Sequence, residues 1–319
     1  MQVPHKGNRF AKRVHYKKGR LKMDIKQIAV LGSGTMGHGI SQAAIFSGFN
    51  VRLYDISMEI VEQNAAKIKG NIQKHFVAKG KISEEEGEKI WNRLSVSDDL
   101  KQAVCEADFV IEAVPENMDL KKKLFSQLDE FCPEHTIFAT NTSVMSVGAI
   151  AGATKRVDRC IGTHFFNPAA IMKLVEVVVP LGVSKETVDT TCALIKKLNK
   201  VPVKTKDLPG FIVNRLLGRL YQECAQMVLE GAATAEEIDT AMKLGANHPM
   251  GPCELADFGG FDVIQMAGDA TWEYTHKESD KVNVLYRKMI EAGRLGRKNG
   301  KGFYDYLEDG TKRPFMIYN

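Results

Sequence analysis

Short apolar runs alternate with stretches of helical periodicity through the first two thirds of the chain. Runs without a polar interruption suit parallel strands that are covered on both faces. The stretches between them repeat their apolar residues at the spacing of an amphipathic helix. This alternation predicts an α/β fold with a doubly wound, mostly parallel sheet. The predicted strands are Ile28–Leu31, Val51–Leu53, Leu94–Ser97, Phe109–Val114, Ile137–Ala139, Cys160–Phe166 and Leu174–Val179.

The pattern changes after Pro209 and Gly210, where the strand-like runs stop and long helical stretches follow. The stretch 211–230 is apolar on several faces, so we expect part of it to pack on a neighbouring element or a second subunit. Thr234 and Glu237 form a capping box that predicts the start of another helix. Because 319 residues exceed what one core usually supports, two domains are expected. We predict the first over residues 24–207 and an all-helical C-terminal domain over residues 208–319.

The run Ile28–Leu31 leads into glycines spaced as G-x-G-x-x-G, at Gly32, Gly34 and Gly37. A strand before such a turn, a helix after it and an acid about 20 residues further on are typical of Rossmann dinucleotide-binding domains. Asp55 is that acid, and it favours NAD over NADP because it would repel a 2′-phosphate. The alternative is a tight turn without a ligand. The predicted cofactor contacts of this turn are Gly32, Ser33, Gly34, Thr35, Met36, Gly37 and Asp55.

Polar side chains follow two of the later predicted strands. Glu116 comes after the strand that ends near Val114, and Ser143 comes after the strand that ends near Ala139. Ligands of open parallel sheets bind at the carboxyl ends of the strands, so Glu116 and Lys121 are candidate contacts near the nicotinamide ribose. The alternative is that Asn117 caps a helix and Lys121 is solvated.

Two polar residues lie inside otherwise apolar strands. His164 is in the predicted strand Cys160–Phe166, and Glu176 is in the predicted strand Leu174–Val179. A lone buried histidine is more often a core group than a catalyst, and a buried glutamate is costly to desolvate. Together each accounts for the other, because a carboxylate next to an imidazole fixes its tautomer and raises its basicity. Such a pair can take the proton of an alcohol whose hydride passes to NAD.

Charge and cysteine usage narrow the class of protein. Residues 1–23 hold eight lysines and arginines and no acid, so the net charge of +5 becomes −3 without them. Nucleic-acid binding by the remainder is therefore not expected. The six cysteines are scattered without a C-x-x-C pair, which argues against a metal site and favours reduced thiols.

The sequence contains no signal-peptide pattern and no apolar run long enough to cross a bilayer. We therefore predict a soluble cytoplasmic protein without a membrane partner. Residues 1–23 are predicted to be a basic, disordered extension. The alternatives for them are a natural start at Met23 and a transit peptide, against which the absence of serine counts.

Several motifs follow one another in a fixed order along the chain. They are GSGTMG, EAVPENMDLKKKLF, NTS, THFFNP, MKLVEVV, PGFIVNR, GANHPMGP and GRKNGKGFYDY. Together they resemble the 3-hydroxyacyl-CoA dehydrogenase family, most closely its stand-alone bacterial 3-hydroxybutyryl-CoA dehydrogenases. The resemblance covers residues 24–306, nearly the whole chain. It implies an NAD-dependent oxidoreductase of fatty-acid and butanoate metabolism that acts on an acyl-CoA substrate and forms a homodimer through its helical C-terminal domain.

The resemblance also implies roles for single residues. His164 would be the general base and Glu176 its orienting partner, while Ser143 and Asn214 would bind the C3 oxygen and the acyl carbonyl of the substrate. The family's cofactor contacts correspond to Glu116, Lys121, Ser143, Asn167 and Lys298, and the lysines expected to meet CoA phosphates are Lys74, Lys79 and Lys81.

One position departs from the family pattern. The family commonly has two serines after Asn-Thr, whereas Val144 follows Ser143 here. We expect this to affect loop shape and chain-length preference rather than activity. The implied reaction is reversible oxidation of the (S)-3-hydroxyl of an acyl-CoA. The alternatives are a related NAD-dependent sugar-acid or hydroxyacid dehydrogenase and a non-catalytic protein that retains the fold.

Overall fold

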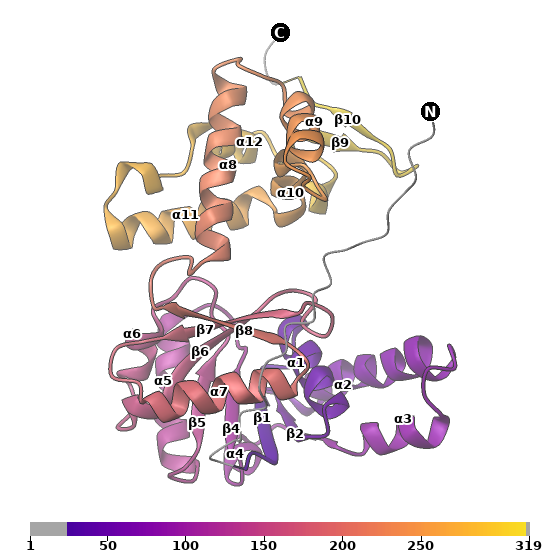
Figure 1. The fold of residues 1–319 in the computed structure, drawn as a ribbon, viewed down its shortest axis with the longest axis vertical. Helices are drawn as coiled ribbons and strands as arrows, with labels where there is room; N and C mark the ends of the chain where they lie inside the picture. Colours follow the sequence, from indigo (N-terminus) through magenta and orange to yellow (C-terminus); the bar gives the residue numbers. More distant parts are fainter. Residues whose placement is uncertain (1–23, 317–319) are drawn as a thin grey trace, which may run out of the picture.

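The computed structural model describes residues 24–316, and its first part is built around one eight-stranded sheet (Figure 1). The strand order is β3-β2-β1-β4-β5-β6-β7-β8, and every neighbouring pair is parallel except β6 and β7. The predicted doubly wound α/β sheet is thereby confirmed. The strands are β1 (Gln27–Leu31), β2 (Asn50–Tyr54), β3 (Leu94–Ser97), β4 (Phe109–Glu112), β5 (Ile137–Thr140), β6 (Cys160–Phe165), β7 (Leu174–Val179) and β8 (Val201–Lys206).

Helices cover both faces of this sheet, which explains why its central strands are mostly apolar. On β1, Ile28 and Val30 belong to the core on one face, whereas Ala29 and Leu31 belong to the core on the other. The first face is covered by α1 (Thr35–Phe46), α2 (Met58–Ile72) and α7 (Lys185–Lys197), and the second by α4 (Leu100–Val104), α5 (Met118–Phe131) and α6 (Val147–Ala151). The π-helix η1 (Gln73–Val77) and then α3 (Glu84–Trp91) follow α2, and the 3₁₀-helix η2 (Val157–Arg159) precedes β6.

The strand β8 lies at one edge of the sheet and is largely exposed. Pro202 has no backbone N–H, and such a residue is tolerated in a strand mainly at an edge. Directly after β8, the chain turns through residues 207–212 into the second part of the molecule.

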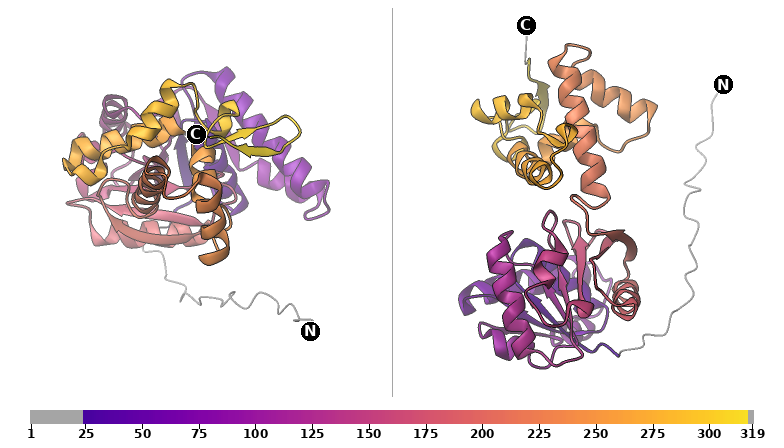
Figure 2. Two further views of the ribbon diagram at one scale, coloured as in Figure 1. Left: turned by 90° about the horizontal axis from the view of Figure 1, so that it is seen from above. Right: turned by 90° about the vertical axis from the view of Figure 1, so that its left-hand side faces the viewer.

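That second part is a helical unit with a core of its own around Phe261, Tyr286 and Phe303. Figures 1 and 2 show that the two units meet where α8 begins. The predicted helical C-terminal part is confirmed, and it also carries a short antiparallel hairpin. Its elements are α8 (Val213–Leu229), α9 (Ala235–Gly245), α10 (Pro252–Gly259), α11 (Phe261–Thr275), η3 (Glu278–Asp280), α12 (Val284–Glu291), η4 (Arg297–Asn299), β9 (Tyr304–Tyr306) and β10 (Lys312–Pro314). Within residues 24–316, no helix is both long and apolar enough to span a membrane.

Candidate functional site

Three glycines shape the turn between β1 and α1. Gly32 has a φ of +93°, and a Cβ there would lie 2.6 Å from the carbonyl oxygen of Ala113, so the position requires glycine. A Cβ on Gly37 would lie 1.7 Å from the carbonyl oxygen of Gly32, which shows how closely α1 sits on the turn. A Cβ on Gly34 would have no atom within 4 Å apart from those of Gly34 itself and its neighbours in the chain. The turn is thus filled on its inner side and open at Gly34.

The open side of the turn carries the N-terminus of α1. Gly34 precedes the first helical residue, Thr35, and α1 has no side-chain cap. Among the described residues, no backbone acceptor is found for the N–H groups of Thr35 and Met36. Unpaired N–H groups and the positive end of a helix dipole favour an anion. These residues therefore fit the pyrophosphate of a dinucleotide.

Asp55 lies beside this turn and is fixed by it. Its Oδ2 accepts hydrogen bonds from the N–H of Ser33 at 2.7 Å and from the Ser33 hydroxyl at 2.6 Å. Asn64 of α2 donates to the same hydroxyl at 2.9 Å. Ser33 is fully buried, so its side chain orients the carboxylate instead of facing a ligand. The sequence did not point to Asn64.

A buried ion pair, which the sequence did not reveal, lies under the carboxyl end of β4. Lys121 and Glu112 are 1% and 0% exposed, and Lys121 Nζ lies 2.6 Å from Glu112 Oε1. Glu112 also accepts from the Thr140 hydroxyl at 2.7 Å and from the N–H of Val114 at 2.8 Å. Its place inside a buried apolar strand was the available signal, since a carboxylate there needs a partner.

The same lysine links this pair to the loop after β5. Lys121 Nζ lies 3.3 Å from Oε2 of Glu116. The other oxygen of Glu116 accepts from the Thr142 hydroxyl at 3.0 Å, and from the N–H and hydroxyl of Ser143 at 2.7 and 3.1 Å. The structure thus brings Glu116, Lys121 and Ser143 into one network, in which Glu116 holds the backbone of Ser143.

His164 and Glu176 form a buried pair on neighbouring strands. They are directly opposite each other in the antiparallel register of β6 and β7. Nδ1 of His164 lies 2.8 Å from Oε2 of Glu176, and the residues are 6% and 0% exposed. The rings of Phe166 and Phe211 lie 4.6 and 5.5 Å from the imidazole. Because Nδ1 faces the carboxylate, Nε2 is the nitrogen left for a proton transfer.

The second oxygen of Glu176 accepts hydrogen bonds from backbone N–H groups at the N-terminus of α8. The N–H groups of Ile212 and Val213 donate to Oε1 at 3.1 and 2.9 Å. Burial alone would raise the pKa of Glu176, but the hydrogen bonds from His164, Val213 and Ile212 outweigh it and hold the pKa below its usual value. The carboxylate therefore stays ionised next to the imidazole.

The remaining predicted site residues are Asn214, Asn167 and Lys298, and they lie in different parts of the chain. Asn214 follows Val213 in the first turn of α8, and within residues 24–316 its amide has no hydrogen-bond partner. Asn167 is exposed just after β6. Lys298 lies in η4 of the helical unit and forms an exposed ion pair with Asp262, so none of its described contacts reaches the glycine turn.

The three lysines expected to meet CoA are exposed and lie in and just after η1. In Figure 1 this segment is at the tip formed by α2 and α3, which projects away from the sheet. Lys74, Lys79 and Lys81 have no described contact with His164 or Glu176, and Lys81 Nζ lies 5.3 Å from the ring centre of Phe76.

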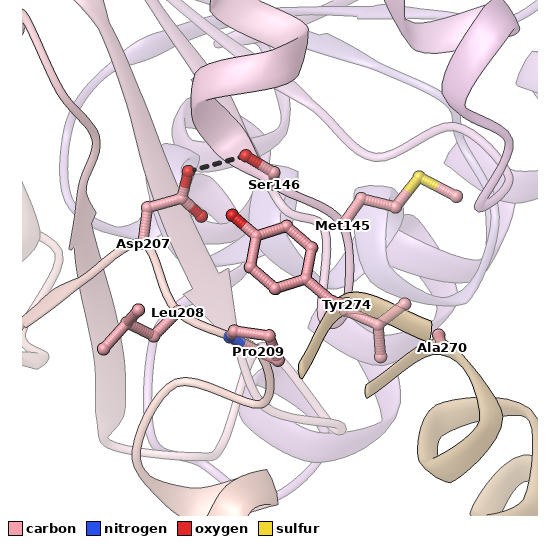
Figure 3. A pocket seen from close by; sticks show the side chains of 8 residues that line it. Met145, Ser146, Asp207, Leu208, Pro209, Ala270 and Tyr274 are labelled. Atoms are coloured by element: carbon pink, nitrogen blue, oxygen red, sulfur yellow. Dashed lines mark hydrogen bonds between the residues drawn. The ribbon is translucent and has the colours of Figure 1, made fainter. Parts of the chain in front are cut away.

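A small cavity lies between the two units (Figure 3). Its volume is about 30 Å³, and it begins at Val144, the residue after Ser143. Tyr274 of α11 points its hydroxyl into it, toward Asp207 and Ser146 (Figure 3). The complete lining is Val144, Met145, Ser146, Asp207, Leu208, Pro209, Ala270 and Tyr274. Elsewhere too, residues 24–316 contain no group of three or more His, Cys, Asp or Glu that could hold a metal ion.

The sheet topology, the open glycine turn and Asp55 define a Rossmann-type dinucleotide-binding protein. The chain matches the model of the 3-hydroxyacyl-CoA dehydrogenase NAD-binding domain over residues 27–208, and that of the family's C-terminal domain over residues 210–306. It therefore belongs to the 3-hydroxyacyl-CoA dehydrogenase family, as the sequence motifs predicted, and NAD is its cofactor.

Individual relatives agree with this assignment. A protein named probable 3-hydroxybutyryl-CoA dehydrogenase from Bacillus subtilis is 45% identical over 90% of this chain and 99% of its own length. A 3-hydroxybutyryl-CoA dehydrogenase from Clostridioides difficile is 44% identical over 88% and 99%. Among solved structures, (S)-3-hydroxybutyryl-CoA dehydrogenase PaaH1 from Ralstonia eutropha has a TM-score of 0.86 at 39% identity and covers 89% of this chain and 100% of its own.

Proposed function

We propose that the protein catalyses the reversible oxidation of (S)-3-hydroxyacyl-CoA to 3-oxoacyl-CoA with NAD, and that 3-hydroxybutyryl-CoA is its main substrate. The observation that carries this proposal is the buried His164–Glu176 pair on the dinucleotide-binding sheet of a chain from this family. A buried imidazole whose second nitrogen is held by a carboxylate is suited to general acid–base work on an alcohol.

In the oxidation direction, Nε2 of His164 takes the proton of the C3 hydroxyl. NAD, when bound, accepts the hydride from that carbon. Glu176 accepts the hydrogen bond from the N–H at Nδ1 of His164, which keeps that proton in place. Because its pKa is lowered, Glu176 stays ionised and stabilises the imidazolium that forms. In the reduction direction His164 returns the proton to the C3 oxygen. General acid–base assistance of this kind is worth roughly 10²–10⁴ in rate.

Ser143 and Asn214 would bind the substrate oxygens on either side of this proton transfer. The Ser143 hydroxyl is held near Glu116, and the unpaired amide of Asn214 is presented at the start of α8. Ser143 lies in the loop after β5, where Asn141 accepts from the N–H of Phe165, the residue after His164. Asn214 follows Val213, which donates to Glu176. We propose that Ser143 binds the C3 oxygen and Asn214 the acyl carbonyl.

For the cofactor, we propose contacts from the glycine turn and from groups at the strand ends. Gly34 leaves room for the pyrophosphate, and Asp55 would bind the adenosine ribose. Because Lys121 is buried, its role would be to set the position of Glu116. Because Ser33 donates to Asp55, its role would be to orient that carboxylate. The complete proposed set is Gly32, Ser33, Gly34, Thr35, Met36, Gly37, Asp55, Glu116, Lys121, Ser143, Asn167 and Lys298.

The names of two relatives support a short acyl chain. Two relatives are named for a four-carbon hydroxyacyl group. The exposed lysines Lys74, Lys79 and Lys81 would interact with the CoA phosphates when substrate is bound.

We further propose that the chain divides into domains at residues 207 and 208, works in the cytoplasm and forms a homodimer through its helical unit. Phe258, Val263 and Met266, on α10 and α11, are 63%, 48% and 53% exposed, and a second subunit would cover such a surface. Residues 1–23, for which the sequence predicted a disordered extension, lie outside the described residues.

The test is NADH oxidation by the purified protein with acetoacetyl-CoA, with longer 3-oxoacyl-CoAs and with free acetoacetate. The expected result is rapid turnover of acetoacetyl-CoA and slow turnover of the free acid. Reduction of NAD by free hydroxy acids or sugar acids, without CoA, would instead support a related hydroxyacid dehydrogenase. Bound NADH without any turnover would support a non-catalytic protein.

A further inference from the structure

Two consecutive residues with positive φ connect the sheet to α8. Gly210 has a φ of +72° and Phe211 a φ of +49°. A residue with a Cβ rarely adopts this left-handed conformation, and it persists only where the surroundings enforce it. The corner is closed by hydrogen bonds from the N–H of Phe211 to the carbonyl of Leu208 at 3.0 Å, and from the N–H of Arg215 to the carbonyl of Gly210 at 2.9 Å.

The side chain of Phe211 anchors this corner in the sheet unit. Phe211 is 4% exposed and forms a small core with Val147 of α6 and Val178 of β7. Its ring centre lies 5.5 Å from that of His164. The residue therefore contacts three elements that surround the pair and forms one wall of the imidazole site.

The corner directs two successive N–H groups at one carboxylate oxygen. Ile212 and Val213 both donate to Oε1 of Glu176, and successive backbone N–H groups at a turn form an anion-binding concavity. If residue 211 returned to negative φ, the direction of both N–H groups would change. Glu176 would then keep His164 as its only hydrogen-bond donor among the described residues.

We infer that the left-handed corner at Gly210 and Phe211 positions the pair of His164 and Glu176. Phe211 is the positioning residue of this corner. The ring of Phe211 anchors the corner, and the corner holds Glu176 in register with His164 through the N-terminus of α8. The inference rests on the proposed function, in which this pair moves the proton. It also connects the helical unit to the pair, since two of the three donors to Glu176 are Ile212, just before α8, and Val213, its first residue.

Few other charged groups face Glu176. On β6 the facing group is His164, and on β8 the residue opposite is Val203. Lys204 is next on β8, so its side chain points to the other face, where its charge acts on Cys192 of α7. Arg215 of α8 is exposed. The backbone donors therefore dominate the environment of the carboxylate beside His164.

Without those donors, Glu176 would hold a proton more readily, and the pair would take up its extra proton at a higher pH. Phe211→Ala is expected to lower kcat for 3-hydroxybutyryl-CoA about 10–100-fold and to move the acid limb of the kcat–pH profile up by about one unit. Phe211→Leu, which keeps most of the apolar volume, is expected to restore both toward wild type. The dissociation constant for NADH should stay within about twofold in both variants.

The matched control is Asn247→Ala, because Asn247 also has a positive φ, of 57°, but lies between α9 and α10. It is expected to keep the wild-type pH profile. A Phe211→Ala protein with lower kcat but an unchanged acid limb would overturn the inference, because loss of packing alone would explain it. An unchanged kcat would overturn it as well.

A backbone substitution avoids the packing change and serves if Phe211→Ala does not fold. Replacing Val213 by the corresponding α-hydroxy acid turns one amide into an ester, which removes the N–H that points at Glu176 and weakens the Ile212 carbonyl as an acceptor for Leu216. The same exchange at Ala235, the first residue of α9, is the control. We expect the ester at Val213 to move the acid limb of the kcat–pH profile to higher pH, and the ester at Ala235 to leave it in place. Equal profiles for the two variants would refute the inference. If the wild-type protein turns over no 3-hydroxyacyl-CoA, it is the proposed function that fails.

Discussion

The buried pair of Lys121 and Glu112 allows a sharp test of how the nicotinamide side of the site is held. Lys121→Met removes the ammonium group and keeps most of the side-chain volume. Glu112 would then be a fully buried carboxylate with the donors Thr140 and Val114 but without a cation. Breaking a buried ion pair from one side costs about 3–5 kcal/mol, because the remaining charge is uncompensated.

That cost corresponds to a fall in Tm of about 6–20 °C, taking roughly 2–4 °C per kcal/mol for a unit of this size. Urea unfolding followed by circular dichroism gives the free energy of unfolding, and calorimetry gives the Tm. The variant is also expected to lose kcat, because Glu116 loses its cation at 3.3 Å and holds Ser143 less firmly.

Two controls separate charge from packing. Adding Glu112→Gln to Lys121→Met removes the unpaired charge, so much of the lost stability is expected to return. Lys89→Met breaks an exposed pair with Glu85, which are 68% and 79% exposed, and is expected to cost less than about 1 kcal/mol. If Lys121→Met costs no more than Lys89→Met, the pair does not hold this part of the site.

Three further predictions concern the base, the cofactor and pH. His164→Ala or Glu176→Gln should lower kcat by roughly 10²–10⁴ with little change in NADH binding, measured by fluorescence titration; wild-type kcat in both would contradict their assignment. Asp55→Ala should narrow the preference for NAD over NADP in kcat/KM, and an unchanged ratio would exclude the ribose contact. Burial raises the pKa of Asp257 to about 6, so its stabilising contribution is complete below its unfolded pKa and is lost as pH rises through 6. Wild type should therefore lose about 2–3 kcal/mol between pH 4 and 7 that Asp257→Asn does not lose, and parallel unfolding curves would refute this.

Much of the fold could be predicted from local pattern. The apolar run of β1 indicated a strand covered on both faces, and the structure divides its residues between two cores. The glycine spacing indicated the turn, where Gly32 and Gly37 are required by close contacts. His164 and Glu176 were connected by the cost of burying each alone, and the structure places them opposite each other.

Contacts between distant segments could not be predicted in this way. The N–H groups that Glu176 receives come from residues 36 and 37 positions later, and a backbone donor leaves no mark on the sequence. Lys121 was a candidate for a cofactor contact or a solvated residue. Helical periodicity does not show whether a long side chain in the first turn of a helix points to solvent or to the core. The burial argument used for Glu176 applies equally to Glu112 and would have identified the need for a partner there.

The exposed position of β8 limits how copies of this chain can associate. A bare edge strand is a template for pairing with another molecule, and natural sheets block such pairing with proline and lysine. Pro202 removes a donor from this edge, and Lys204 and Lys206 place like charges along it. Extension of the sheet from one copy into the next is therefore disfavoured, which protects the protein against ribbon-like aggregation at high concentration.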